Sequence, residues 1–279
     1  MDFLKMPVAD LIELGKQKSN YYINAKPFPN IYFDNFFNPE ALDSVVSEFP
    51  EIGKAVSDIQ FHTPNENKLA TKGEYRFGEA TKQLVHFLNS QPFLEFLQNI
   101  SGITETLIPD PYFEGGGFHE IKPGGYLKMH VDFHKHKYTN LDRRLNVLVY
   151  LNKDWEESYG GCFELWERDM SKGIVKILPL FNRMAIFSTT GYSWHGHPDP
   201  LTCPPDRSRR SLALYYYSNG RPAEEVANAD GAKTITSFTL RKGQDSGKMV
   251  LFNTYKKILR NWVPPIILTT AKKITGKKD

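Results

Sequence analysis

Between about residues 106 and 220 the sequence consists of short β-like runs separated by Gly, Pro and Asn. Closely spaced short strands with turn residues between them are typical of sandwiches and double-sheet jelly rolls. The chain has 279 residues, of which 40% are hydrophobic, and all-β domains often reach this size as single units. We therefore predict an α+β, mainly β chain with a jelly-roll core at residues 106–220.

The two flanks differ from this core. Residues 1–105 form a mostly helical support region in this prediction, and residues 221–279 form an extension that carries one candidate strand and a basic tail. The clearest helix signal is Asn38 followed by Pro39, an N-cap and an N1 proline before an apolar i, i+3, i+4, i+7 pattern. Further helices are expected at residues 78–90 and 92–100, and the candidate strand at residues 234–240.

Composition argues against several classes of protein. The net charge of +3 is small, and no basic patch is interleaved with aromatic residues, so we expect no nucleic-acid partner. The N-terminus lacks a cationic start followed by an apolar run, and no run of about 18 apolar residues suggests a membrane span. Cys162 and Cys203 do not form a disulfide framework. These features favour a cytoplasmic protein.

The sequence His130-Val131-Asp132 lies within the β-patterned core, and His195 follows later in it. On a strand, residues i and i+2 point to the same face, so His130 and Asp132 can reach one ion while Val131 packs the other way. Two imidazoles and one carboxylate on one face of a metal form the facial triad of non-haem Fe(II) oxygenases. The spacing therefore suggests chemistry with molecular oxygen.

A lone His-x-Asp is weak evidence, but further signals follow it in order. These are a run from Arg144 through Tyr150-Leu151-Asn152, the pair Gly160-Gly161, a strand ending at Phe187, then His195 and Arg209. Over residues 118–218 this succession resembles the prolyl 4-hydroxylase-like group of 2-oxoglutarate- and Fe(II)-dependent dioxygenases. The resemblance implies a cupin-like double-stranded β-helix. It also implies Fe(II), 2-oxoglutarate and O2, and it leaves ascorbate open as a reductant.

The choice of the second histidine ligand rests on local sequence. His195 follows Ser193-Trp194, as the family pattern has it, whereas His197 precedes Pro198, which tends to leave the strand. We assign the metal ligands as His130, Asp132 and His195, and keep His197 as the alternative, in a loop or behind the ligands. The remaining histidines of this region are expected at the surface or in loops: His119, His134 and His136.

A dicarboxylate cosubstrate needs a cation for its far end, and the planar fork of arginine suits a carboxylate. Strand alternation places Arg209, with Ser211 and Tyr215, on the inner face and Arg210 on the outer, Leu-bearing face. We therefore assign Arg209 and keep Arg210 as the alternative. The resemblance adds Tyr150, Asn146 and Phe163 as cosubstrate contacts; the alternative for Tyr150 is a core tyrosine with a satisfied hydroxyl, and for Phe163 a plain core residue. It also suggests aromatic residues around the pocket: Tyr126, Tyr215 and Trp194.

The resemblance implies hydroxylation of an unactivated C–H bond with release of succinate and CO2. Because Asp132 fills the place that chloride takes in halogenating members of the family, hydroxylation is favoured over halogenation. We take a prolyl residue of a peptide or protein as the first candidate substrate, and a free amino acid or other small molecule as the alternative. A second alternative is a non-catalytic jelly-roll sensor that binds metal. The basic tail suggests weak contact with an anionic membrane surface or an acidic partner.

Overall fold

The computed structural model describes residues 2–226, 235–241, 243–245 and 247–262. The chain divides into two compact units, Met1–Thr239 and Leu240–Asp279. The second contains helix α6 (Gly247–Trp262). Among the described residues no helix is both long and apolar enough to cross a membrane. The end of the basic tail, from residue 263, lies outside the described residues, so its predicted contacts stay a prediction.

Four helices precede the core strands: α1 (Val8–Asn24), α2 (Pro39–Ser47), α3 (Glu79–Leu88) and α4 (Gln91–Ser101). The Asn38 side chain accepts a hydrogen bond from the Glu40 amide at 3.1 Å, and Pro39 is the first residue of α2. Gly102 ends α4 in the left-handed region, at φ 70°, where glycine carries no penalty. The expected helices are therefore present, and α1 is an addition to them.

The N-terminal region also contributes three strands, β1 (Asn30–Asp34), β2 (Ile59–Thr63) and β3 (Glu66–Ala70). Strand β1 pairs with β10 (Arg183–Ser188), and β3 pairs with β5 (Gly117–Ile121). The prediction for residues 1–105 named helices and did not include these three strands. Strand β2 pairs with the neighbouring β3, whereas β1 and β3 join the sheet through partners far away in the sequence, which no local pattern reveals.

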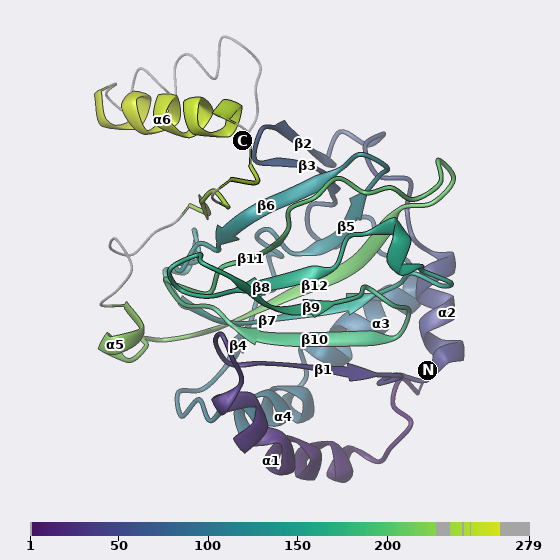
Figure 1. The fold of residues 1–279 in the computed structure, drawn as a ribbon. Helices are drawn as coiled ribbons and strands as arrows, with labels where there is room; N and C mark the ends of the chain where they lie inside the picture. Colours follow the sequence, from purple (N-terminus) through teal and green to yellow (C-terminus); the bar gives the residue numbers. More distant parts are fainter. Residues whose placement is uncertain (1, 227–234, 242, 246, 263–279) are drawn as a thin grey trace. The chain divides into compact units, whose positions relative to one another are not determined.

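The strands form one sheet in the order β1-β10-β7-β12-β5-β3-β6-β11-β8-β9 (Figure 1). Its pairings are antiparallel, and the fold is the predicted double-stranded β-helix. The remaining strands are β4 (Ile108–Pro109), β6 (Tyr126–Val131), β7 (Asp142–Tyr150), β8 (Phe163–Trp166), β9 (Gly173–Ile177), β11 (His195–His197), β12 (Arg209–Ser218) and β13 (Ser237–Phe238). The short elements are the 3-10 turn Glu157–Tyr159 and α5 (Ala223–Val226).

Strand β12 separates the core under the helices from the interior of the barrel. Leu212, Leu214 and Tyr216 belong to the apolar cluster that includes the helices, and the Tyr216 hydroxyl donates to the Leu88 carbonyl at 2.9 Å. Arg209 and Tyr215 point the other way and line a cavity. This alternation is the one predicted from the Leu-bearing face.

The sheet folds back so that strands from the two halves of its path face each other. Tyr150 of β7 and Phe187 of β10 pack with Phe163 of β8 and Ile177 of β9 in one buried cluster. Strand β13 adds to β6, with Phe238 opposite His130. It is shorter than the expected strand at residues 234–240, whose first residue lies outside the described part of the chain.

Candidate metal centre

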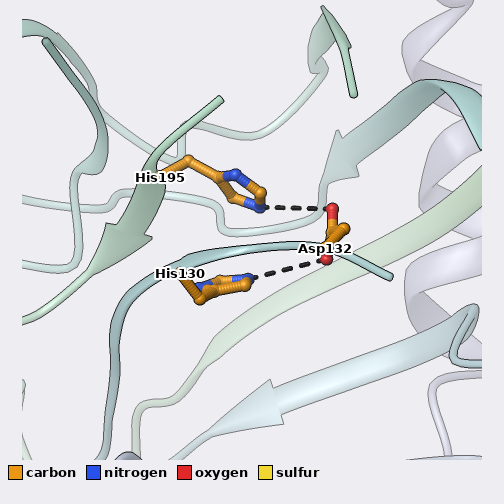
Figure 2. A group of neighbouring side chains, drawn as sticks. All are labelled: His130, Asp132 and His195. Carbon is orange, nitrogen blue, oxygen red and sulfur yellow. Dashed lines mark ion pairs between the residues drawn. The ribbon is translucent and has the colours of Figure 1, made fainter. Parts of the chain in front are cut away.

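His130, Asp132 and His195 meet at one point in the interior (Figure 2). His130 lies on β6, Asp132 directly follows that strand, and His195 opens β11 opposite His130 in register. The His130 Nε2 atom lies 3.7 Å from Asp132 Oδ1, and His195 Nε2 lies 3.4 Å from Asp132 Oδ2. One ligand atom from each residue lies within 4.8 Å of the others, so one ion can contact all three.

Hydrogen bonds orient the two imidazoles. The His130 Nδ1 atom lies 2.9 Å from the Lys128 carbonyl oxygen, and His195 Nδ1 lies 2.8 Å from that of Ser193. A carbonyl oxygen only accepts, so each Nδ1 carries the proton and each Nε2 is free to bind a metal. Burial, followed by the charge of His195, lowers the pKa of His130 to about 3. His130 is therefore neutral, as a metal ligand must be.

Asp132 is held by two polar side chains of β7. Its Oδ2 atom accepts a hydrogen bond from Asn146 Nδ2 at 2.7 Å and lies 3.1 Å from Arg143 Nη2. Arg143 Nε donates to Asn146 Oδ1 at 2.8 Å, so the three groups form a closed set. Burial would raise the pKa of Asp132, but Arg143 and then His195 lower it well below its usual range. The carboxylate is ionised, with Oδ1 turned toward His130.

This arrangement changes the expected role of Asn146. Its side chain binds both Asp132 and Arg143, so Asn146 orients the carboxylate as well as lining the cavity, and its expected cosubstrate contact stays a prediction. Sequence analysis missed Arg143, because simple alternation from Asn146 points it outward. Where β7 pairs with β12, Leu145 lies opposite Tyr216, but the next pair is Arg143 with Tyr217. Strand β7 therefore has one extra residue, Arg144, at this point. This bulge turns Arg143 inward.

We expect Asn146→Ala and Arg143→Gln to weaken metal binding by roughly 10- to 100-fold, the usual effect of losing a group that orients a ligand. Calorimetric titration of the full chain with Mn(II) measures this change. Arg210→Ala, on the outer face, is the control and should bind as the unaltered protein does. Unchanged affinity in both β7 variants would show that Asp132 needs no support from them.

Next to the triad lies a cavity of about 240 Å³. Arg209 lines it and is 4% exposed; its Nε donates to the Gly161 carbonyl at 2.8 Å and its Nη2 to the Tyr150 hydroxyl at 3.4 Å. Within the described part of the chain no carboxylate pairs with Arg209. A buried charge without a counter-ion is costly, and burial lowers the pKa of this guanidinium. The cavity is therefore prepared for an anion.

Gly161 gives Arg209 its place. Its φ of +72° lies in the left-handed region, and a Cβ there would lie 3.0 Å from Arg209 Cδ and 2.7 Å from Leu201 Cδ2. Arg210, the alternative anchor, points outward: its guanidinium lies 4.7 Å from the centroid of the Phe49 ring, and its Nε lies 3.5 Å from Glu120 Oε1. The structure thus places Arg209, and not Arg210, in the cavity.

The aromatic residues expected around the pocket divide into two groups. Phe163 and Tyr215 line the cavity, whereas Tyr126 and Trp194 do not.

An irregular pairing of β6 with β11 explains the position of Tyr126. His195 lies opposite His130 and His197 lies opposite Leu127, so β6 has one extra residue between these two pairs. This irregularity turns Leu127 inward and Tyr126 outward, where its hydroxyl donates to the Thr63 carbonyl at 3.1 Å. Trp194 precedes His195 and points away from it, with Nε1 donating to the Arg168 carbonyl at 3.2 Å.

Two histidines expected in a solvated loop are buried instead: His134 and His136 are each 3% exposed. His136 Nδ1 accepts hydrogen bonds from the amides of Tyr138 and Thr139, at 3.2 and 3.1 Å, and Nε2 lies 3.1 Å from Asp110 Oδ1. His136 therefore fixes its own loop, which the Lys-rich sequence did not indicate. His119 is half-buried on β5 and lines the cavity.

Comparison with known proteins gives one family. Residues 116–217 match the model described as the 2OG-Fe(II) oxygenase superfamily. No curated protein sequence matches significantly.

Several solved structures share the fold. A prolyl-4-hydroxylase of Pseudomonas putida is 15% identical with a TM-score of 0.53, over 77% of this chain and 100% of that one. A Trichoplax adhaerens prolyl hydroxylase in complex with a peptide fragment is 18% identical, with a TM-score of 0.51, over 79% and 94%. HygX of Streptomyces hygroscopicus with nickel and 2-oxoglutarate bound is 12% identical, with a TM-score of 0.52, over 80% and 99%.

Proposed function

We propose that this chain, whose residues 116–217 form a domain of the 2OG-Fe(II) oxygenase superfamily, hydroxylates a prolyl residue of a peptide or protein. One observation carries the reaction class: a His-Asp-His triad shares a single cavity with a buried arginine that has no counter-ion among the described residues. A site that only stored a metal would have no use for that arginine. The enzyme is thus a 2-oxoglutarate-dependent non-haem iron dioxygenase.

The side chains of the site divide the work. His130, Asp132 and His195 would hold Fe(II) from one side, and Arg143 with Asn146 keeps Asp132 ionised and oriented. Bound Fe(II) and 2-oxoglutarate supply the oxidation of a C–H bond by O2, with release of succinate and CO2.

The cosubstrate end of the cavity belongs to other residues. Arg209 and the Tyr150 hydroxyl would bind the carboxylate of 2-oxoglutarate farthest from the metal. Phe163 packs against the His195 ring, with 5.6 Å between centroids, and keeps water from that side.

The prolyl substrate is supported by the fold that the chain shares with the Pseudomonas and Trichoplax prolyl hydroxylases. The alternative, a free amino acid or another small molecule, has support of the same kind, because HygX has been solved with hygromycin B bound. The apolar part of the cavity wall, with Ile59, Phe61, Leu127, Phe133 and Phe238, suits an aliphatic ring. Substrate choice is therefore the part of the proposal that most needs an experiment.

A screen for succinate release tests it. We expect the Fe(II)-loaded protein to form succinate in step with a 16 Da mass gain on proline-containing peptides, and to leave free proline and other amino acids unchanged. His130→Ala serves as the inactive control. Turnover of free amino acids alone would replace the prolyl assignment with the alternative. A protein that binds metal but neither binds 2-oxoglutarate nor consumes it would be the non-catalytic sensor.

A further inference from the structure

His197 has no assigned role in the site, yet its side chain is 3% exposed and lines the same cavity as Arg209. It is the last residue of β11, not part of the loop expected from the following proline. Neither Nδ1 nor Nε2 has a hydrogen-bond partner among the described residues. Buried polar atoms are nearly always bonded, because leaving one unpaired is costly. The imidazole therefore faces something that binds in the cavity.

His197 is not placed to be a third imidazole ligand of the metal. His195 is opposite His130 in register, whereas His197 is opposite Leu127, farther along both strands. Of the described residues that could form a metal cluster, only His130, Asp132 and His195 come together here. What His197 binds therefore lies in the cavity beside the triad, not at the metal position itself.

The charged groups near His197 indicate the nature of this ligand. Two cationic side chains, Arg209 and Lys68, line the cavity together with His197. Lys68 is paired with Glu66, Nζ to Oε2 3.3 Å, whereas Arg209 has no acidic partner among the described residues. An anion that neutralises Arg209 would also meet the imidazole of His197.

We propose that His197 is a cosubstrate-binding residue that hydrogen-bonds the distal carboxylate of 2-oxoglutarate together with Arg209. This inference rests on the proposed function, because it takes 2-oxoglutarate as the cavity's ligand. A carboxylate offers about four lone-pair sites, so a guanidinium and an imidazole can bind it at the same time. Strand β8 connects His197 with Arg209. It pairs with β11 at Gly196, the residue before His197, and the carbonyl of Gly161, shortly before β8, accepts a hydrogen bond from Arg209.

The test compares two 2-oxo acids on the full-length protein loaded with Zn(II), which cannot turn over. 2-Oxoglutarate carries the distal carboxylate and 2-oxobutyrate lacks it. In calorimetric titrations we expect H197L to weaken 2-oxoglutarate binding roughly 10- to 100-fold, the usual effect of a hydrogen bond to a charged group. Binding of 2-oxobutyrate and of Zn(II) should not change. H197Q, which keeps a donor, should recover part of the loss.

Equal losses for both acids, or no loss for 2-oxoglutarate, would overturn the proposal, and so would a loss of Zn(II). If H197L unfolds, as circular dichroism would show, H197V provides the same comparison. The variant R209A, which keeps His197, tests the proposed function separately in the same titrations with the two 2-oxo acids. If the unaltered protein binds both acids equally well and R209A changes neither, 2-oxoglutarate is not the ligand. If R209A is impaired but H197L is not, only the role of His197 fails.

Discussion

We expect replacement of His130, Asp132 or His195 by alanine to abolish turnover and to reduce Fe(II) binding by more than the roughly 10- to 100-fold effect of losing a supporting group. Each of these residues supplies one of the three ligand atoms that the described residues bring together, and two ligands cannot cap a face of the ion. Anaerobic titration with Fe(II), read together with succinate release, measures both effects. His197→Ala is the matched control for Fe(II) binding, since it changes a buried histidine two residues from His195.

The control variant should keep most of its metal, although its 2-oxoglutarate binding is expected to weaken. If His197→Ala lost Fe(II) while His195→Ala kept it, the order of ligands on β11 would be reversed. The visible charge-transfer band of the complex of Fe(II) with 2-oxoglutarate adds an independent reading. It should be absent from the three ligand variants even at saturating 2-oxoglutarate.

Arg209→Ala should raise the KM for 2-oxoglutarate roughly 30- to 5000-fold, because removing one partner of a buried charge pair costs about 2–5 kcal/mol. The guanidinium is buried, and its own hydrogen bonds go to Gly161 and Tyr150, so the cosubstrate carboxylate would lose its one counter-charge there. Cosubstrate titrations at saturating substrate measure the effect.

Arg210→Ala is the neighbouring control for this prediction. Its side chain lies over Phe49 and near Glu120, on the outer face of β12, so KM should change little. A large effect at Arg210 with none at Arg209 would mean that β12 is shifted by one residue, since such a slip exchanges the two faces of a strand.

Much of the site could be predicted from local rules. The i, i+2 spacing of His130 and Asp132, the alternation along residues 209–216 and the cap at Asn38 depend on geometry that a few neighbouring residues determine. The structure brings the triad together and turns Arg209 inward in agreement with those rules. The family signals between residues 118 and 218 added the order in which these pieces occur.

Other residues of the site depend on tertiary structure. Arg143 reaches Asp132 because β7 has an extra residue where it pairs with β12. Tyr126 lies outside the cavity because β6 has an extra residue where it pairs with β11. A bulge reverses which side chains face inward, and it arises from how two distant strands pair. Alternation counted along one strand cannot detect it.

The sequence by itself determined the fold class, the three metal ligands as a set and the inward face of Arg209. The pairing of His130 with Asp132 and the face of Arg209 follow from alternation along single strands, whereas the family resemblance supplied His195 and the cupin-like fold. Only the tertiary structure decided that β1, β2 and β3 join the sheet, and that His134 and His136 are buried. It also decided that His197 lines the cavity and that neither of its ring nitrogens has a hydrogen-bond partner among the described residues. Burial and sheet membership depend on contacts between distant segments, such as β1 with β10 and β3 with β5, and a local pattern carries no information about contacts at such distances.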